Sequence, residues 1–462
     1  MKLIQKKYIY LFIIFLTSII LRLYNLNFED LWYDELASFW IADPNISTIE
    51  TIERNIEINK GPHLVFSIIL KYFFFIFGYN PDIGRLIPLI FGTASVPAII
   101  YLTKMIDKSK AWLFVGFLIS INYYSISYSQ ELRSYSLTFF LCLINLIFFI
   151  KILHKHSLLY NFLFYLVTLL ALSNHIFFFI ILFTELLFLL LIHRNDGIKF
   201  YILISNIFFI IVSYLFLMHD ALSAQLAIKE FWIEQVKVDF FINYYFSRFF
   251  GSKIMGLIYL STLLYLLWCK RNILINKSNK LFLFLLIIIN CYFLPVTYGF
   301  IKIPILIDRY IIFVLIPILI LISILIFKLE NRKTRNTILL ILVLSTFVNN
   351  YIEIFNRKNT KPEFKKSILF IKNSNSSIYM LADNVNLNDK LVLNYIKRIN
   401  PKNIELELYD DVNKSSVKSV WVICYLPITD FNCNKPLNLN NNFIMKKDKS
   451  FNLIKLVYYE KS

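Results

Sequence analysis

The chain has 462 residues, of which 58% are hydrophobic and 18% aromatic, with nine glycines and a formal net charge of +18. Apolar runs of about 16 to 25 residues, broken by short basic clusters, are typical of a polytopic helical membrane protein and exclude a single soluble domain. The basic residues form no broad patch, so the charge indicates membrane topology and attraction to lipid surfaces, and it argues against nucleic-acid binding.

The first apolar run, residues 8–24, predicts an anchor that stays in the membrane. Three lysines precede it and no small-residue cleavage site follows, so we expect the N-terminus in the cytoplasm. Placing the later basic clusters on the same side predicts eleven crossings and an external C-terminus. These crossings lie near 8–24, 86–103, 111–125, 135–150, 158–173, 176–192, 199–218, 252–269, 281–296, 310–327 and 337–352. We expect the shorter run 64–77 to lie along or dip into the outer leaflet.

The composition becomes rich in Lys and Asn beyond residue 350. Short apolar runs at 377–381, 417–425 and 453–459 predict strands of a small α/β domain that can fold alone. The expected division is therefore a membrane domain, 1–352, with a first extracytoplasmic loop at 25–63, and an extracytoplasmic domain, 353–462. Cys424 and Cys433 lie in the latter, either bridged, if it faces an oxidising compartment, or as two free thiols.

The most unusual polar stretch is NFEDLWYDELASFW, residues 27–40, directly after the first apolar run. It holds Glu29, Asp30, Asp34 and Glu35 among aromatic residues, which are frequent at the lipid headgroup level. Neighbouring side chains point in different directions on a helix or strand, so Asp34 and Glu35 can serve two roles. One carboxylate can act as a general base while the other orients a partner or a cation. The alternative to a catalytic role is that the acids form a loop that keeps a segment at the membrane interface hydrated.

Further candidates lie on the same predicted outer face. Ionisable residues near span ends are functional candidates because charge at membrane depth is costly. Arginine forks suit phosphate oxygens, and a lysine adds a point charge. The alternatives are local ion pairs at helix ends and, for the histidine, an interfacial residue with a satisfied hydrogen bond. These candidates are Lys60, Arg85, Glu131, Arg133, Tyr135, His175, Arg309 and Tyr310.

Several signals of soluble enzymes are missing from the sequence. It has no Gly-rich phosphate loop, no zinc-type His and Cys spacing and no G-x-S-x-G serine elbow. A nucleotide-driven reaction is therefore not expected. An acid pair with cations from distant segments suits a lipid-linked phosphate, because the cations stabilise charge on the leaving phosphate and a carboxylate accepts a proton from an incoming hydroxyl.

Five stretches carry a family resemblance in a fixed order across roughly residues 20–330. They are LRLYNLNFEDLWYDELASFW, GPHLVFSIILKYFFFIFG with GRLIPLIFG, YYSISYSQELRSYSL, ALSNHIFFF and DRYIIFVLIP. The chain resembles the GT-C membrane glycosyltransferases of family 39, which include protein O-mannosyltransferases and the lipid A aminoarabinose transferase. KPEFKKSILFIK resembles the start of the family's outer domain. The resemblance implies a GT-C fold with about 11 to 13 transmembrane helices.

The resemblance also implies an activity, namely inverting transfer of a monosaccharide from a polyprenyl-phosphate carrier to a lipid, glycan or protein acceptor. The site would face the extracytoplasmic side, which we expect to be that of a bacterial inner membrane. Asp34 would be the general base with Glu35 in support, and a divalent cation on these two acids is left open, since no full ligand set is visible. The resemblance places Arg133 and Arg309 near the donor phosphate, Tyr135, His175 and Tyr310 around the cavity, and Lys60 or His63 at its mouth. From residue chemistry alone, Lys60 and Arg85 join the candidates for phosphate binding, and His63 and Glu131 join those around the cavity.

Two departures from the family pattern leave details open. The usual His-Pro-Pro-Leu reads Gly61-Pro62-His63-Leu64 here, so the residue that contacts the donor is undecided between Lys60 and His63. The long C-terminal elaborations of protein-mannosylating members are not recognisable, which argues weakly against a protein acceptor. The alternative function is a transporter or flippase, or a non-catalytic binding subunit, for a lipid-linked sugar. A transporter predicts charged or broken helices near mid-membrane and a repeat between halves, and we recognise neither in the sequence.

Overall fold

The computed structural model describes residues 2–61, 63–155, 157–228, 233–236, 246–272, 280–374, 378–381, 387–399, 405–406, 418–426 and 442–461. These residues form two compact units, each assembled from several segments. Unit 1 comprises Met1–Tyr24, Thr48–Ile69 and Leu86–Arg357, and unit 2 comprises Asn25–Ser47, Leu70–Arg85 and Lys358–Ser462. The sequence suggested a single boundary after residue 352, whereas in the structure the acidic stretch belongs with the C-terminal residues.

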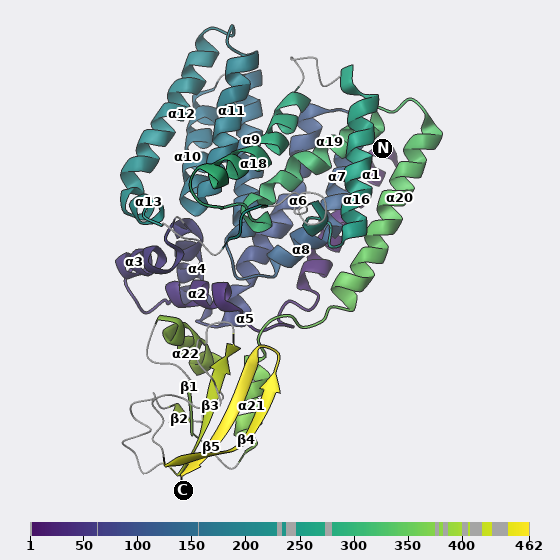
Figure 1. Ribbon diagram of the computed structural model, residues 1–462. Coiled ribbons are helices and arrows are strands. Elements are labelled where there is room, and N and C mark those ends of the chain that lie inside the picture. The colour runs from purple at the N-terminus through teal and green to yellow at the C-terminus, as the bar shows by residue number, and fades with distance from the viewer. Residues whose placement is uncertain are drawn as a thin grey trace. The chain divides into compact units, whose positions relative to one another are not determined.

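Every predicted crossing overlaps at least one helix (Figure 1). The helices are α1 (Lys2–Leu23), α6 (Leu86–Ile106), α7 (Ala111–Ile121), α9 (Tyr135–His154), α10 (Leu158–Asn174), α11 (Phe179–Ile192), α12 (Ile198–Leu217), α16 (Lys253–Cys269), α18 (Leu281–Ile301), α19 (Leu315–Phe327) and α20 (Arg332–Asn350). Within the described residues, six helices are long and apolar enough to cross a membrane, or seven if one bent pair is a single span. The chain is therefore a polytopic helical membrane protein, as expected.

Shorter elements connect these helices or line their ends. They are α2 (Tyr33–Ile41), α3 (Thr48–Asn59), α4 (Leu64–Phe77), α5 (Pro81–Gly84), α8 (Tyr123–Ser129), η1 (Ile176–Phe178), α13 (His219–Leu226), α15 (Phe246–Arg248), η3 (Asp308–Val314) and η4 (Tyr351–Phe355). The apolar helix α4 has 14 residues, fewer than the roughly 20 that a crossing needs.

The expected span at 111–125 is broken, which corrects the sequence-based prediction. Helix α7 ends at Ile121 and α8 leaves at an angle of 56°. Asn122 joins them, and its side chain accepts a hydrogen bond of 2.9 Å from the backbone N–H of Ser125. An Asn in this place caps the second helix and offers the chain an alternative to continuing the first one.

Arg22 of α1 holds this bend from the inside. Its fully buried guanidinium donates to the carbonyls of Ile119 and Ser120, each at 3.3 Å, at the end of α7. It also donates to the hydroxyls of Ser125 at 2.8 Å and Ser129 at 3.1 Å in α8. The arginine thus satisfies carbonyls that the end of α7 leaves without helical partners.

A second departure is Glu185, which is fully buried within the otherwise apolar helix α11. One acid inside FIILFTELLFLLLI does not interrupt the apolar run, so the sequence analysis overlooked it. An ionisable residue in such a helix is costly and therefore a functional candidate. Glu185 and the break between α7 and α8 are features that the sequence analysis had not recognised and that the transporter alternative calls for.

The C-terminal part of unit 2 contains a mixed five-stranded sheet in the order β2-β1-β3-β5-β4. Strands β1 (Ile378–Leu381), β3 (Ser419–Tyr425) and β5 (Ile454–Lys461) match the expected runs, whereas β2 (Glu405–Leu406) and β4 (Phe443–Phe451) were not expected. Strand β1 is parallel to β2 and β3, and β5 is antiparallel to β3 and β4. The highly charged β4 is mostly exposed at the sheet edge, which explains why no apolar run marks it.

Two helices of unit 2 accompany the sheet, α21 (Phe364–Lys372) and α22 (Leu387–Ile399). Phe370 of α21 packs against the fully buried Trp421 of β3 with ring centroids 5.5 Å apart, which makes an aromatic core. Cys424 in the same strand is disulfide-bonded, and Cys433, its expected partner, lies outside the described residues.

Candidate active site

Helix α2 of unit 2 carries the adjacent acids Asp34 and Glu35. Asp34 is half-buried, whereas Glu35 is fully buried. Glu35 occupies the third helical position, where its carboxylate lies 3.5 Å from the backbone N–H of Trp32, as in a capping box. The two neighbouring carboxylates therefore lie in different environments, and only Asp34 combines a carboxylate with partial access to solvent.

The carboxylate of Glu35 is paired with two cations of unit 2. Arg85 Nη2 lies 3.1 Å from both carboxylate oxygens, and Lys361 Nζ lies 2.8 Å from Oε2. Arg85 is only 2% exposed and also donates to the carbonyl of Glu29 at 2.6 Å. A buried carboxylate needs such compensation. This geometry favours a role for Arg85 in holding Glu35 over the phosphate-binding role that the sequence suggested.

The other two acids of the stretch are held by the same C-terminal segment. Glu29 Oε1 accepts hydrogen bonds from the backbone N–H of Thr360 at 2.8 Å and from its hydroxyl at 3.0 Å. Asp30 accepts from the backbone N–H of Lys365 at 2.7 Å and from the hydroxyl of Tyr395 at 3.2 Å. Burial raises the pKa of Asp30, and these donors oppose that shift. The sequence analysis missed all these partners, although the stretch KPEFKK that contains Lys361 had been recognised.

A divalent cation on Asp34 and Glu35 does not fit this arrangement. Both oxygens of Glu35 already face Arg85 or Lys361. No group of three or more His, Cys, Asp or Glu that could hold a metal occurs within the part of the chain that the structure describes. Calcium and magnesium take six or more oxygen ligands and zinc takes four ligands, so we derive no step through a metal at this acid pair.

A second set of candidate residues surrounds His175 in unit 1, at the turn between α10 and η1. The backbone N–H of Phe177 donates to His175 Nδ1 at 3.3 Å, so the proton of the neutral ring lies on Nε2. Nε2 is buried, and no described residue forms a hydrogen bond with it. The ring of His63 meets that of His175 edge to face at 5.2 Å, and His63 Nδ1 lies 3.0 Å from the hydroxyl of Ser134.

Both histidines are neutral at physiological pH. Burial, followed by the positive charges of Arg133 and Arg309, lowers the pKa of His175 to about 3. Burial, His175 and the same arginines hold the pKa of His63 well below its usual value. Both arginines therefore lie close enough to impose a positive potential on the histidine pair.

Aromatic rings connect the arginines to the histidines. The guanidinium of Arg133 lies 5.8 Å from the ring centre of Tyr135, and that of Arg309 lies 5.8 Å from Tyr310. The ring of Tyr310 is 5.3 Å from His175, and that of Tyr135 is 6.1 Å away. The structure thus brings together residues from distant stretches of the chain.

Asn174 fixes the turn that carries His175. Its side-chain nitrogen donates to Thr138 Oγ1 at 2.8 Å and to the carbonyl of Ser134 at 3.3 Å, both near the start of α9. Its side-chain oxygen accepts from the backbone N–H of Phe66 in α4 at 3.1 Å. One buried amide therefore joins α4, α9 and α10 and orients the neighbouring histidine.

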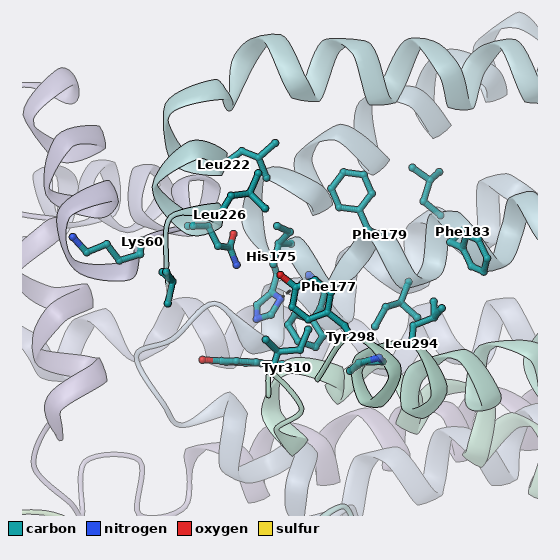
Figure 2. A pocket seen from close by; sticks show the side chains of 18 of the residues that line it. Lys60, His175, Phe177, Phe179, Phe183, Leu222, Leu226, Leu294, Tyr298 and Tyr310 are labelled. Atoms are coloured by element: carbon teal, nitrogen blue, oxygen red, sulfur yellow. Dashed lines mark hydrogen bonds between the residues drawn. The ribbon is translucent and has the colours of Figure 1, made fainter. Parts of the chain in front are cut away.

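His63, His175 and Tyr310 border a pocket of about 540 Å³ within unit 1 (Figure 2). Four predicted site residues line it, namely Lys60, His63, His175 and Tyr310. Lys60 lies at one end, His175 and Tyr310 lie in the middle, and apolar side chains such as Phe183 and Leu294 form the other end. Of the other residues predicted for unit 1, Arg133 and Tyr135 are buried, Glu131 and Arg309 are half-buried, and none of these four lines the pocket.

The sequence was also compared with known proteins. No family model and no curated protein matches it. Among solved structures, ArnT from Cupriavidus metallidurans in the apo state matches with a TM-score of 0.62 at 8% identity, over 99% of this chain and 98% of that chain. The same protein bound to undecaprenyl phosphate gives 0.61 at 8% identity, with 98% of each chain covered.

An oligosaccharyltransferase from Archaeoglobus fulgidus in its apo form also matches, with a TM-score of 0.52 at 10% identity, over 89% of this chain and 69% of that chain. At such low identities the likeness establishes the fold and leaves the reaction to be argued from the site. The chain therefore has the GT-C fold, as its resemblance implied, and matches ArnT over nearly its whole length.

Proposed function

We propose that this protein is an inverting glycosyltransferase that moves a monosaccharide from a polyprenyl-phosphate carrier to a lipid, glycan or protein acceptor. The site would act on the extracytoplasmic face of a bacterial inner membrane. The observation that carries the proposal is the pocket of unit 1, which has Lys60 at one end, His175 in the middle and apolar side chains at the other end. A polyprenyl phosphate has the same two-part chemistry, and a structure of the same fold contains undecaprenyl phosphate.

The proposed reaction is a single displacement. The hydroxyl oxygen of the acceptor attacks the anomeric carbon and forms the new bond, while the bond from that carbon to the phosphate oxygen breaks. The polyprenyl phosphate leaves with the bonding electrons, and attack from the opposite face inverts the configuration. Asp34 would accept the proton of the attacking hydroxyl. Glu35 is unsuited to that role because its carboxylate is buried between Arg85 and Lys361.

Unit 1 would stabilise the phosphate. Arg133 and Arg309 supply positive potential, and Lys60 adds a point charge at the pocket end. His175 is neutral and carries its proton on Nε2, so it would donate a hydrogen bond to a phosphate or sugar oxygen without adding charge. Aromatic and aliphatic side chains beyond it would hold the first isoprene units, which gain free energy by leaving water.

The second candidate function is a transporter or flippase, or a non-catalytic binding subunit, for a lipid-linked sugar. Glu185 inside α11 and the bend between α7 and α8 favour this reading, since transporters place ionisable residues and helix breaks at substrate sites. In that reading the pocket would hold the same ligand, and Asp34 would take no part in bond formation.

A transfer assay distinguishes the glycosyltransferase from the transporter or binding subunit. Purified protein would receive polyprenyl-phosphate sugars with a radiolabelled sugar, together with membrane lipid extract as the acceptor source. We expect label to move to an acceptor with the native chain, and Asp34→Asn to reduce the rate about 10²- to 10⁴-fold. Asp448→Asn, at a half-exposed acid paired with Lys455, is the control and should transfer normally. Saturable binding of the lipid without transfer would instead support the transporter or binding-subunit function.

A further inference from the structure

The segment 358–365, here called the clasp, contacts three of the four acids in the stretch 27–40. Thr360 binds Glu29, Lys361 binds Glu35, and Lys365 binds Asp30. These partners are 326 to 335 positions apart in sequence, so the contacts depend entirely on tertiary structure. Nothing in the proposed chemistry requires a segment of the C-terminal domain to reach this stretch, and its role therefore calls for an explanation.

Lys361 is the most informative residue of the clasp. Its side chain is 10% exposed, and its ammonium group lies 2.8 Å from Glu35 Oε2. Its main chain is also fixed, because its carbonyl accepts a hydrogen bond of 2.8 Å from the side chain of Asn452 and its N–H donates to Asn359 Oδ1 at 3.0 Å. The ion pair with Glu35 and the two main-chain hydrogen bonds thus fix the position of the ammonium group together.

Asn452 links the clasp to the sheet. It lies between β4 and β5, where Leu453 has a φ of 56°, a conformation of tight turns. Its backbone N–H donates to Glu363 Oε2 at 3.1 Å and its carbonyl accepts from the Glu363 N–H at 3.2 Å. A continuous set of hydrogen bonds therefore runs from the β4–β5 turn through Lys361 to Glu35 in the first turn of α2.

We propose that Lys361 is a positioning residue that, together with Arg85, fixes Glu35 and thereby the first turn of α2, on which Asp34 stands. The inference rests on the proposed function, in which Asp34 is the general base. Two buried cations bound to one carboxylate restrict its rotation more than a single one does. A base that is displaced by about 1 Å loses much of its rate, even when the change lies away from the reacting atoms. The C-terminal domain thus helps to set the geometry of the acid motif.

Four variants in the full-length protein test this role. Lys361→Met removes the charge and keeps the length, and Lys361→Arg restores a cation. Asn452→Ala keeps Lys361 but removes the side chain that holds its carbonyl. Lys372→Met is the matched control, since this exposed lysine lies in the last turn of α21, outside the clasp. For each, we would measure kcat, KM for a polyprenyl-phosphate sugar, and hydrogen exchange of the amides in 33–41.

We expect Lys361→Met to lower kcat about 100-fold, to change KM less than about threefold, and to speed exchange in 33–41. Lys361→Arg should recover most of kcat, Asn452→Ala should show a smaller loss, and Lys372→Met should match the native protein. Native kcat and exchange in Lys361→Met would overturn the proposal, as would equal loss in the Met and Arg variants with unchanged exchange. If the native protein transfers no sugar, the proposed function fails, and exchange alone then decides whether Lys361 fixes α2.

Discussion

The two candidate regions use basic residues in opposite ways. In unit 2, Arg85 and Lys361 form ion pairs with the buried carboxylate of Glu35, which compensates their charges inside the protein. In unit 1, Arg133 and Arg309 act on two neutral histidines and lower the pKa of both. The first arrangement fixes a helix, whereas the second directs positive potential to residues of a pocket. Basic residues that look equivalent in sequence thus support structure in one region and, in the function proposed above, ligand binding in the other.

The largest expected effect is on stability, when the carboxylate that pairs with the two cations of unit 2 is removed. Glu35→Ala leaves Arg85 and Lys361 buried without their acid, which typically costs about 3 to 5 kcal/mol of unfolding free energy. Thermal unfolding in detergent should show a large drop. Glu35→Gln retains the shape and part of the hydrogen bonding, so its unfolding temperature should lie between those of the native protein and Glu35→Ala. A loss below about 1 kcal/mol would show that the network contributes little.

The arginines of unit 1 should behave differently. Arg133→Met should weaken binding of a polyprenyl phosphate about 10-fold, because the variant removes a positive charge that acts on the pocket residue His175. Binding of the uncharged polyprenol should change little. Arg85→Met, the matched substitution in unit 2, should lower stability and leave lipid affinity nearly unchanged in the protein that remains folded. A loss of lipid affinity in Arg85→Met together with unchanged affinity in Arg133→Met would contradict the proposed difference between the two regions.

The histidine pair makes stability depend on pH. His175 keeps a pKa of about 3 in the folded protein, whereas an unfolded histidine titrates near 6.5. The unfolded chain therefore binds the proton first as the pH falls, and His175 alone should lower stability by about 1.4 kcal/mol per pH unit between these values, to which His63 adds. Thermal unfolding from pH 7 to pH 5 should show this slope. His175→Gln should reduce the slope by about 1.4 kcal/mol per pH unit, and an unchanged slope in that variant would assign the effect to other groups. The exposed His219→Gln is the matched control.

The smallest expected effect concerns an ordinary surface pair. Arg54 and Glu50 form an i,i+4 ion pair of 2.6 Å on α3, with Glu50 44% exposed. Arg54→Met should cost about 0.3 to 0.5 kcal/mol, with no effect on lipid binding. A loss as large as that of Glu35→Ala would show that salt bridges of this protein cannot be ranked by burial.

Sequence patterns predicted the helices well because an apolar run of sufficient length has few other folds in a membrane. They also marked the residues around His175, which carry charge or rings near helix ends. Three features escaped them. The break at Asn122 depends on Arg22 from another helix, β4 has no apolar face of its own, and Lys361 gains its role from partners hundreds of residues away. Each depends on tertiary contacts that local periodicity does not encode.

The most direct test of the account is where a lipid-linked phosphate binds. A polyprenyl phosphate with a photoreactive group in its first isoprene units would be cross-linked to the native protein in detergent, with and without an excess of unlabelled polyprenyl phosphate. We predict cross-links to pocket residues such as Phe179, Phe183 and Leu294, which polyprenyl phosphate suppresses and polyprenol suppresses far less. Cross-links spread over the outer helix surfaces and insensitive to either competitor would contradict the assignment of this pocket to the donor.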